Sequence, residues 1–108
     1  MSFGEFRREA AKEAMEAVEA GDASEAAQRT VEGLKRRELS ALDSLESMEL
    51  EERPPAEIQA RADEVAAIHR ELTDARVEAR EAGAVAEREQ AQSKSAARNL
   101  EDAESGKR

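Results

Sequence analysis

Apolar residues recur every seven positions from Ile58 to Ala103, at two positions of the repeat. One position reads Ile58, Val65, Leu72, Ala79, Ala86, Ser93 and Leu100, and the other reads Arg61, Ile68, Ala75, Ala82, Glu89, Ala96 and Ala103. A repeat of seven keeps a narrow apolar stripe, here called the seam, on one side of a helix, which is typical of a coiled-coil strand. The pattern predicts a helix over about residues 55–103. Its seam becomes mostly alanine after Leu72, so it brings a second helix close while burying little apolar area.

A second helix is predicted over about residues 23–52. Its seam alternates spacings of four and three residues and reads Ala27, Val31, Leu34, Glu38, Ala41, Leu45 and Met48. Leu39, Leu42 and Leu50 lie outside that seam and widen the apolar stripe, as in a helix that contacts two neighbours. The Pro54-Pro55 pair ends the helix, because proline lacks an amide proton and clashes with a preceding helical turn. Such a short connection predicts that the two helices are antiparallel neighbours.

A shorter N-terminal helix is predicted over about residues 3–20. Ser2 and Glu5 have the spacing of a capping box, in which the serine hydroxyl accepts a hydrogen bond from the Glu5 amide. One face of this helix carries Phe3, Phe6, Ala10, Ala14 and Val18. Gly21 suits the position just past a helix end, and Asp22 with Glu25 has the spacing of a second capping box. The sequence therefore predicts a break at residues 21–22.

The predicted fold class is all-α: an antiparallel helical hairpin or coiled coil of the two long helices, plus the N-terminal helix, in a single domain over residues 1–108. The N-terminal helix can continue the second helix end to end, forming a rod of roughly 65–70 Å at 1.5 Å per residue. Alternatively, it folds back as a separate element on the hairpin or on a second chain, which is the favoured interpretation. Gly83 marks a kink, a close crossing or the end of the rigid part, and residues 104–108 are expected to fray.

The composition also argues against a compact globule. Charged residues make up 40% of the chain and aromatic residues 2%, and alanine accounts for 23 of the 42 residues counted as hydrophobic. The remaining 19 larger apolar residues are spread along the whole chain. They are too few to offset a chain entropy of roughly 1–2 kcal/mol per residue in a globular core. We expect the isolated monomer to be marginally stable and to work in contact with other chains.

The net charge of −9 is spread evenly, with −3 over residues 1–23, −3 over 24–55 and −3 over 56–108. An evenly acidic surface repels nucleic acid and anionic membranes, so neither is an expected partner. The chain contains no cysteine and no apolar run of the roughly 18 residues that a membrane span requires. The expected location is cytoplasmic, or a virion component assembled in the cytoplasm.

Few residues carry candidate chemistry. His69 is the only histidine, and its neighbours at three and four residues are Ala66, Leu72, Val65 and Thr73, so no zinc or di-iron helix motif is present. We interpret His69 as flanking the seam, with a pH-sensitive contact as the alternative. The seam acids Glu38 and Glu89 either set the register or are simply exposed. No phosphate loop or nucleophile–histidine pair occurs, so we expect no catalytic residues, no cofactor, no metal site and no enzymatic activity.

Three sets of residues are the candidate interaction sites. The interaction seam comprises Val31, Leu34, Leu45, Met48, Ile58, Val65, Ile68 and Leu72. The two phenylalanines, Phe3 and Phe6, are candidate docking anchors, or else cap the hairpin from within the same chain. The acidic edge comprises Asp43, Glu46, Glu49, Glu51 and Glu52, from a block of six acids without a base between residues 38 and 52. The leading hypothesis is a non-enzymatic structural or assembly protein that oligomerises or docks on a larger complex, and the alternative is a small acidic regulator or inhibitor of a basic partner.

Overall fold

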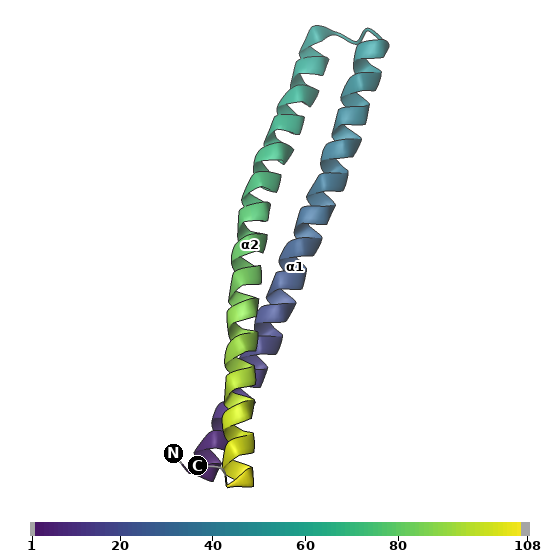
Figure 1. The fold of residues 1–108 in the computed structure, drawn as a ribbon. Coiled ribbons are helices and arrows are strands. Elements are labelled where there is room, and N and C mark those ends of the chain that lie inside the picture. Colours follow the sequence, from purple (N-terminus) through teal and green to yellow (C-terminus); the bar gives the residue numbers. More distant parts are fainter. Residues whose placement is uncertain (1, 107–108) are drawn as a thin grey trace. The chain divides into compact units, whose positions relative to one another are not determined.

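The computed structural model describes residues 2–106 as a helical hairpin (Figure 1). Helix α1 spans Phe3–Leu50 and helix α2 spans Pro55–Ser105. The two helices pack against each other, and residues 2–106 contain no strand. The prediction of an all-α hairpin with its turn at the proline pair is therefore confirmed.

The predicted break at residues 21–22 is wrong, because α1 continues through Gly21 and Asp22 without interruption. The separate N-terminal helix and the second helix are one element, as in the end-to-end alternative. A glycine inside a helix costs only about 1 kcal/mol relative to alanine. Burial next to the glycine can offset that cost: Ala20 is half-buried and Ser24 is buried on the side of α1 that faces α2.

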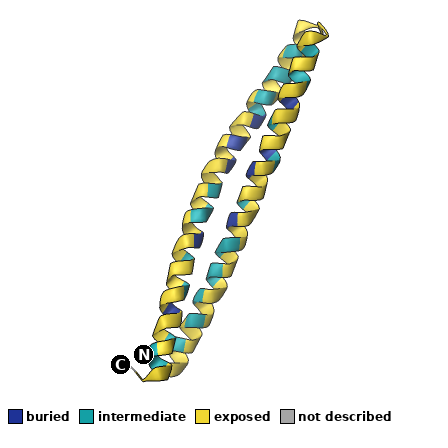
Figure 2. Cartoon of the chain, turned by 45° about the vertical axis from the view of Figure 1, so that its right-hand side comes forward, coloured by how far each residue is buried: buried dark blue, intermediate teal, exposed yellow. Residues whose placement is uncertain are grey.

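The seven-residue repeat extends along all of α1. One position reads Phe6, Glu13, Ala20, Ala27, Leu34, Ala41 and Met48, and the other reads Ala10, Ala17, Ser24, Val31, Glu38 and Leu45. Every one of these residues, and every seam residue predicted between Ile58 and Ala103, is buried or half-buried. Figure 2 shows the resulting stripe along the facing sides of the helices. Of the predicted N-terminal face, Phe6 and Ala10 are half-buried in this stripe, and Phe3, Ala14 and Val18 are exposed.

Two compact units divide the chain: Met1–Ala26 with Arg80–Arg108, and Ala27–Ala79. The Ala27–Ala79 unit holds the turn and the bulkiest packing, a cluster of Val31, Leu34, Leu72 and Ala75 with Ala79 against it. The other unit packs small residues, among which Ala86 and Ala96 are buried. Leucine and valine bury more apolar area per residue than alanine, so the Ala27–Ala79 unit has the stronger core.

The turn between the helices has the hydrogen bonds of a Schellman motif. The Arg53 amide donates to the Met48 carbonyl (3.0 Å) and the Glu52 amide donates to the Glu49 carbonyl (3.1 Å). Glu52 adopts the left-handed conformation with φ 56°, which glycine usually occupies at this position of the motif. The Pro54 carbonyl then accepts the first bonds of α2, from Glu57 (3.0 Å) and Ile58 (3.2 Å). The proline pair therefore both ends one helix and begins the next.

The remaining boundaries differ from the predictions only slightly. The Glu5 amide donates to Ser2 Oγ over 3.3 Å, as half of the predicted capping box. Helix α2 ends at Ser105, and residues 107 and 108 lie outside the described residues, so fraying of residues 104–108 stays a prediction. The helix also continues through Gly83, where a Cβ would meet only Ser24 Oγ at 3.9 Å. Gly83 is therefore not required by a close crossing of the helices.

Candidate functional site

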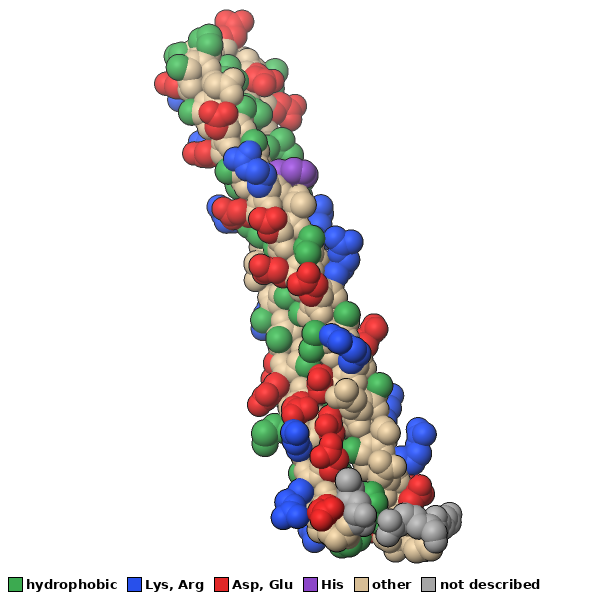
Figure 3. Space-filling view, turned by 90° about the vertical axis from the view of Figure 1, so that its left-hand side faces the viewer, with side chains coloured by type: hydrophobic (Ala, Val, Ile, Leu, Met, Phe, Trp, Pro, Cys, Tyr) green, Lys and Arg blue, Asp and Glu red, His purple; other side chains and the backbone are tan. Residues whose placement is uncertain are grey.

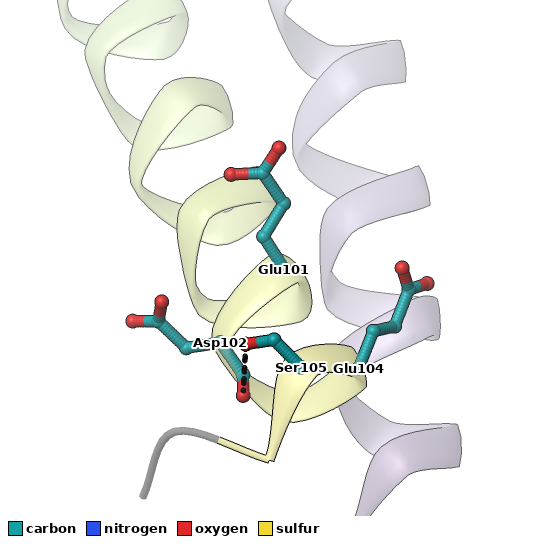
Figure 4. Close-up of a pocket in the computed structure, with 4 residues that line it drawn as sticks. All are labelled: Glu101, Asp102, Glu104 and Ser105. Atoms are coloured by element: carbon teal, nitrogen blue, oxygen red, sulfur yellow. Dashed lines mark hydrogen bonds between the residues drawn. The ribbon is translucent and has the colours of Figure 1, made fainter.

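A surface hollow at the end of α2 is lined by Glu101, Asp102, Glu104 and Ser105 (Figure 4). Ser105 Oγ donates a hydrogen bond to the Asp102 backbone carbonyl (3.2 Å), so this hydroxyl is already used within the last turn of α2. The three carboxylates point in different directions around the helix (Figure 4). The hollow therefore lacks the converging polar groups and apolar walls that ligand sites have.

Glu38 and His69 form the principal polar contact within the Ala27–Ala79 unit. Glu38 Oε2 lies 2.9 Å from His69 Nδ1, so α1 and α2 are joined at a defined register. The Glu38 side chain is 22% exposed and that of His69 is 63% exposed. The contact is a hydrogen bond when a neutral ring carries its proton on Nδ1, and an ion pair when the ring is protonated. It gives the seam acid the partner that a register-setting role requires.

Sequence inspection missed this contact because it considered only the carboxylates on the helix that carries His69. The partner comes from the other helix, 31 residues away. A usable signal was present: in an antiparallel hairpin turning at Pro54-Pro55, residues opposite each other have nearly constant summed numbers. Glu38 and His69 lie nearly equidistant from that turn. Arg37 and Glu71, which form an ion pair at 3.5 Å, have residue numbers with almost the same sum as those of Glu38 and His69.

An acidic cluster lies in the other unit, where carboxylate oxygens of Glu13, Glu16 and Glu89 all lie within 4.8 Å of one another. With its nitrogen turned toward the cluster, the Gln92 amide lies 3.2 Å from Glu13 Oε2 and 3.3 Å from Glu89 Oε2. Partial desolvation, a hydrogen bond with Glu9, and repulsion by the neighbouring glutamates raise the pKa of Glu13 above 4.5.

The cluster brings together one oxygen from each of three carboxylates, whereas calcium and magnesium ions take about six oxygen ligands. Its three carboxylates are half-buried, and the Gln92 amide already faces two of them. We therefore interpret the cluster as a point of charge repulsion between the helices. Glu89, which the sequence suggested as a register-setting residue, lies among like charges instead of opposite a base.

The predicted interaction residues fall into different environments. In the seam, Val31, Leu34, Ile68 and Leu72 are buried, and Leu45, Met48, Ile58 and Val65 are half-buried. The candidate anchors differ: Phe6 is half-buried on the seam, whereas Phe3 is 45% exposed with the Arg7 guanidinium 5.8 Å from its ring centre. All five residues of the acidic edge are exposed. Acidic and basic side chains are interspersed on the face shown in Figure 3.

The most distinctive surface is one side of α1 within the Ala27–Ala79 unit. Leu39, Leu42 and Leu50 lie there with exposed fractions of 62%, 42% and 79%. At 3.5 residues per turn, Leu42, Leu39 and Leu50 lie roughly 75°, 130° and 180° around the helix from the middle of the seam, so they share one face that ends opposite the seam. We call this surface the α1 flank; its charged residues are Arg29, Glu32, Lys35, Arg36, Asp43, Glu46 and Glu49.

The side of α1 across the seam from the flank carries no large apolar residue. Between residues 33 and 51 it presents Gly33, Arg37, Ser40, Ser44, Ser47 and Glu51. Scattered single leucines on a surface are normal, but Leu39 and Leu42 on one side of the helix, with no large apolar residue on the matching side, form a pattern. Neither α1 nor α2 has a stretch long and apolar enough to cross a membrane, as far as the structure describes the chain. Comparisons with protein-family models, with curated proteins and with solved structures find no match.

Proposed function

We propose that this protein is a non-enzymatic structural or assembly component whose coiled-coil hairpin docks on another helical chain through the α1 flank. The observation that carries the proposal is the exposure of Leu39, Leu42 and Leu50 on one side of a helix whose seam already faces α2. A helix with apolar residues on both its seam and its flank can pack against two neighbouring helices. The hairpin supplies one neighbour, and the proposed partner supplies the other.

The thin core of the hairpin supports the same proposal. Among the described residues, Leu72 is the one large side chain that is almost completely buried, and much of the remaining seam is alanine. Covering three exposed leucines adds about 25 cal/mol for each Å² of apolar surface removed from water, which is substantial for a protein with so little core. We also propose a cytoplasmic location, or a virion assembled in the cytoplasm, which the lack of cysteine supports.

Site-specific photo-crosslinking in the cells that produce the protein tests the docking role. A photoreactive phenylalanine analogue replaces Leu39, on the flank, or Ser40, the adjacent residue on the opposite side of α1. We expect covalent adducts from position 39 and few from position 40. Equal adducts from both positions, or none from position 39, would refute docking through the flank.

The acidic regulator remains a second candidate, because Asp43, Glu46, Glu49, Glu51 and Glu52 are all exposed near the turn. This arrangement allows carboxylates to meet a basic partner surface without a large apolar contact. The same crosslinker at position 51 distinguishes the two functions. Adducts that form at position 51 but not at 39, and that disappear at high salt, would favour the regulator.

A further inference from the structure

We infer that the partner of the α1 flank is a second copy of this chain, whose own α1 lies antiparallel against it. The inference rests on the proposed function, since it names the partner for that surface. It draws on the order of charges along the flank. The basic residues Arg29, Lys35 and Arg36 precede the leucines Leu39 and Leu42, and the acidic residues Asp43, Glu46 and Glu49 follow them.

This order makes the flank complementary to itself in one orientation only. A parallel second copy would place Lys35 beside Lys35 and Glu46 beside Glu46, which costs free energy in both halves. An antiparallel copy, related by a twofold axis between Leu39 and Leu42, places the basic half of each flank against the acidic half of the other. Such an isologous contact closes on itself and yields a dimer instead of a filament.

The register of this dimer follows from the position of the axis. Leu39 of one copy lies opposite Leu42 of the other, so these two leucines form the centre of the contact. Lys35 lies opposite Glu46, and Arg36 lies beside Asp43. An apolar centre with charged residues toward its ends is the usual anatomy of a protein interface.

One like-charged pair, Glu32 with Glu49, opposes this register, and a neighbouring lysine reduces its cost. Glu32 lies opposite Glu49 of the other copy, but Lys35 Nζ is 3.2 Å from Glu32 Oε1 within the same helix. The opposite side of α1 lacks such complementarity, because between residues 33 and 51 it carries only two charged residues, Arg37 and Glu51. The flank therefore combines exposed leucines with charges that the second copy can neutralise.

Charge-exchange variants of the full chain test the dimer by sedimentation equilibrium. The first variant carries Lys35→Glu and Arg36→Glu, which makes its flank almost wholly acidic. The second carries Asp43→Lys and Glu46→Lys, which makes its flank largely basic. We expect each variant alone to dimerise with a dissociation constant raised roughly tenfold or more, and an equimolar mixture to recover association as a heterodimer.

Two controls accompany these variants. Arg70→Glu with Arg76→Glu makes the same change in net charge on α2 and should leave dimerisation nearly unchanged. Circular dichroism shows whether each variant retains its helices, since Lys35→Glu also removes the pair with Glu32. A triple variant, Leu39→Gln, Leu42→Gln and Leu50→Gln, should remain helical and become monomeric.

A wild-type chain that stays monomeric at high micromolar concentration would overturn the dimer. So would a mixture of the two charge variants that associates no better than either alone. These failures are distinct from failure of the proposed function. Adducts at position 39 whose mass corresponds to one copy of this chain joined to a different protein would preserve the docking role and refute self-association. Adducts with the mass of two copies would support both.

Discussion

Replacing Leu72 by alanine should destabilise the hairpin more than any other single truncation in its seam. Leu72 is 1% exposed and packs in the cluster with Val31, Leu34 and Ala75. The substitution removes three carbon atoms, worth about 0.8 kcal/mol each when buried. A residual cavity adds to this loss, but the hairpin is only two helices thick, so neighbouring side chains or water can reach the gap.

The expected loss is therefore about 2–3 kcal/mol, in the lower part of the range of roughly 2–5 kcal/mol for buried leucines. The slightly higher helix propensity of alanine offsets only a few tenths of a kcal/mol. A loss of this size is a large share of the roughly 5–15 kcal/mol that stabilises an ordinary domain. The melting temperature should fall by roughly 10 °C or more.

Urea unfolding followed by far-ultraviolet circular dichroism measures this loss. Leu50→Ala is the matched control, because Leu50 is 79% exposed and its truncation should change the free energy of unfolding by no more than about 0.5 kcal/mol in the monomer. Both variants should be measured at two protein concentrations, since dimerisation stabilises the folded state by mass action. If Leu72→Ala and Leu50→Ala differed by less than about 0.5 kcal/mol at the lower concentration, the assignment of Leu72 to the core would be refuted.

Three further substitutions test local features of the hairpin. Gly83→Ala should increase the free energy of unfolding by about 0.5–1 kcal/mol, because the new methyl group has room and alanine favours the helix; a loss of stability in urea unfolding would show that the helices approach more closely there. Glu52→Gly should increase the free energy of unfolding by up to about 1 kcal/mol, because glycine removes a left-handed strain of roughly 1–2 kcal/mol but also makes the unfolded chain more flexible. The control Glu51→Gly should not increase the free energy of unfolding. Glu13→Gln should raise the melting temperature at neutral pH. The pKa of Glu13 is raised in the folded chain, so the ionised carboxylate destabilises the folded state. This destabilisation disappears as the pH falls through the raised pKa toward 4.5. If Glu13→Gln raised the melting temperature equally at neutral pH and near pH 4.5, ionisation of Glu13 would not be the cause.

The sequence alone determined the helical fold, the turn and most of the residues that face across the hairpin. The seven-residue repeat predicted the buried residues Ile68 and Leu72 because helical periodicity is a local property that requires no knowledge of the partner. The proline pair predicted the turn for the same reason, since proline prevents a continuing helix whatever surrounds it. The exposed leucines of the α1 flank were also visible in the sequence as departures from the seam.

Other features were decided by tertiary structure. The Gly21-Asp22 signal favours a helix end by about 1 kcal/mol, a preference that packing of the adjacent turns on α2 can override. The contact between Glu38 and His69 and the cluster of Glu13, Glu16 and Glu89 each join residues from both helices. Their distances depend on the register in which α1 meets α2. Local rules give each helix its own seam, but only the packing of one seam on the other decides which polar residues meet, because that choice depends on free energies summed over the whole contact.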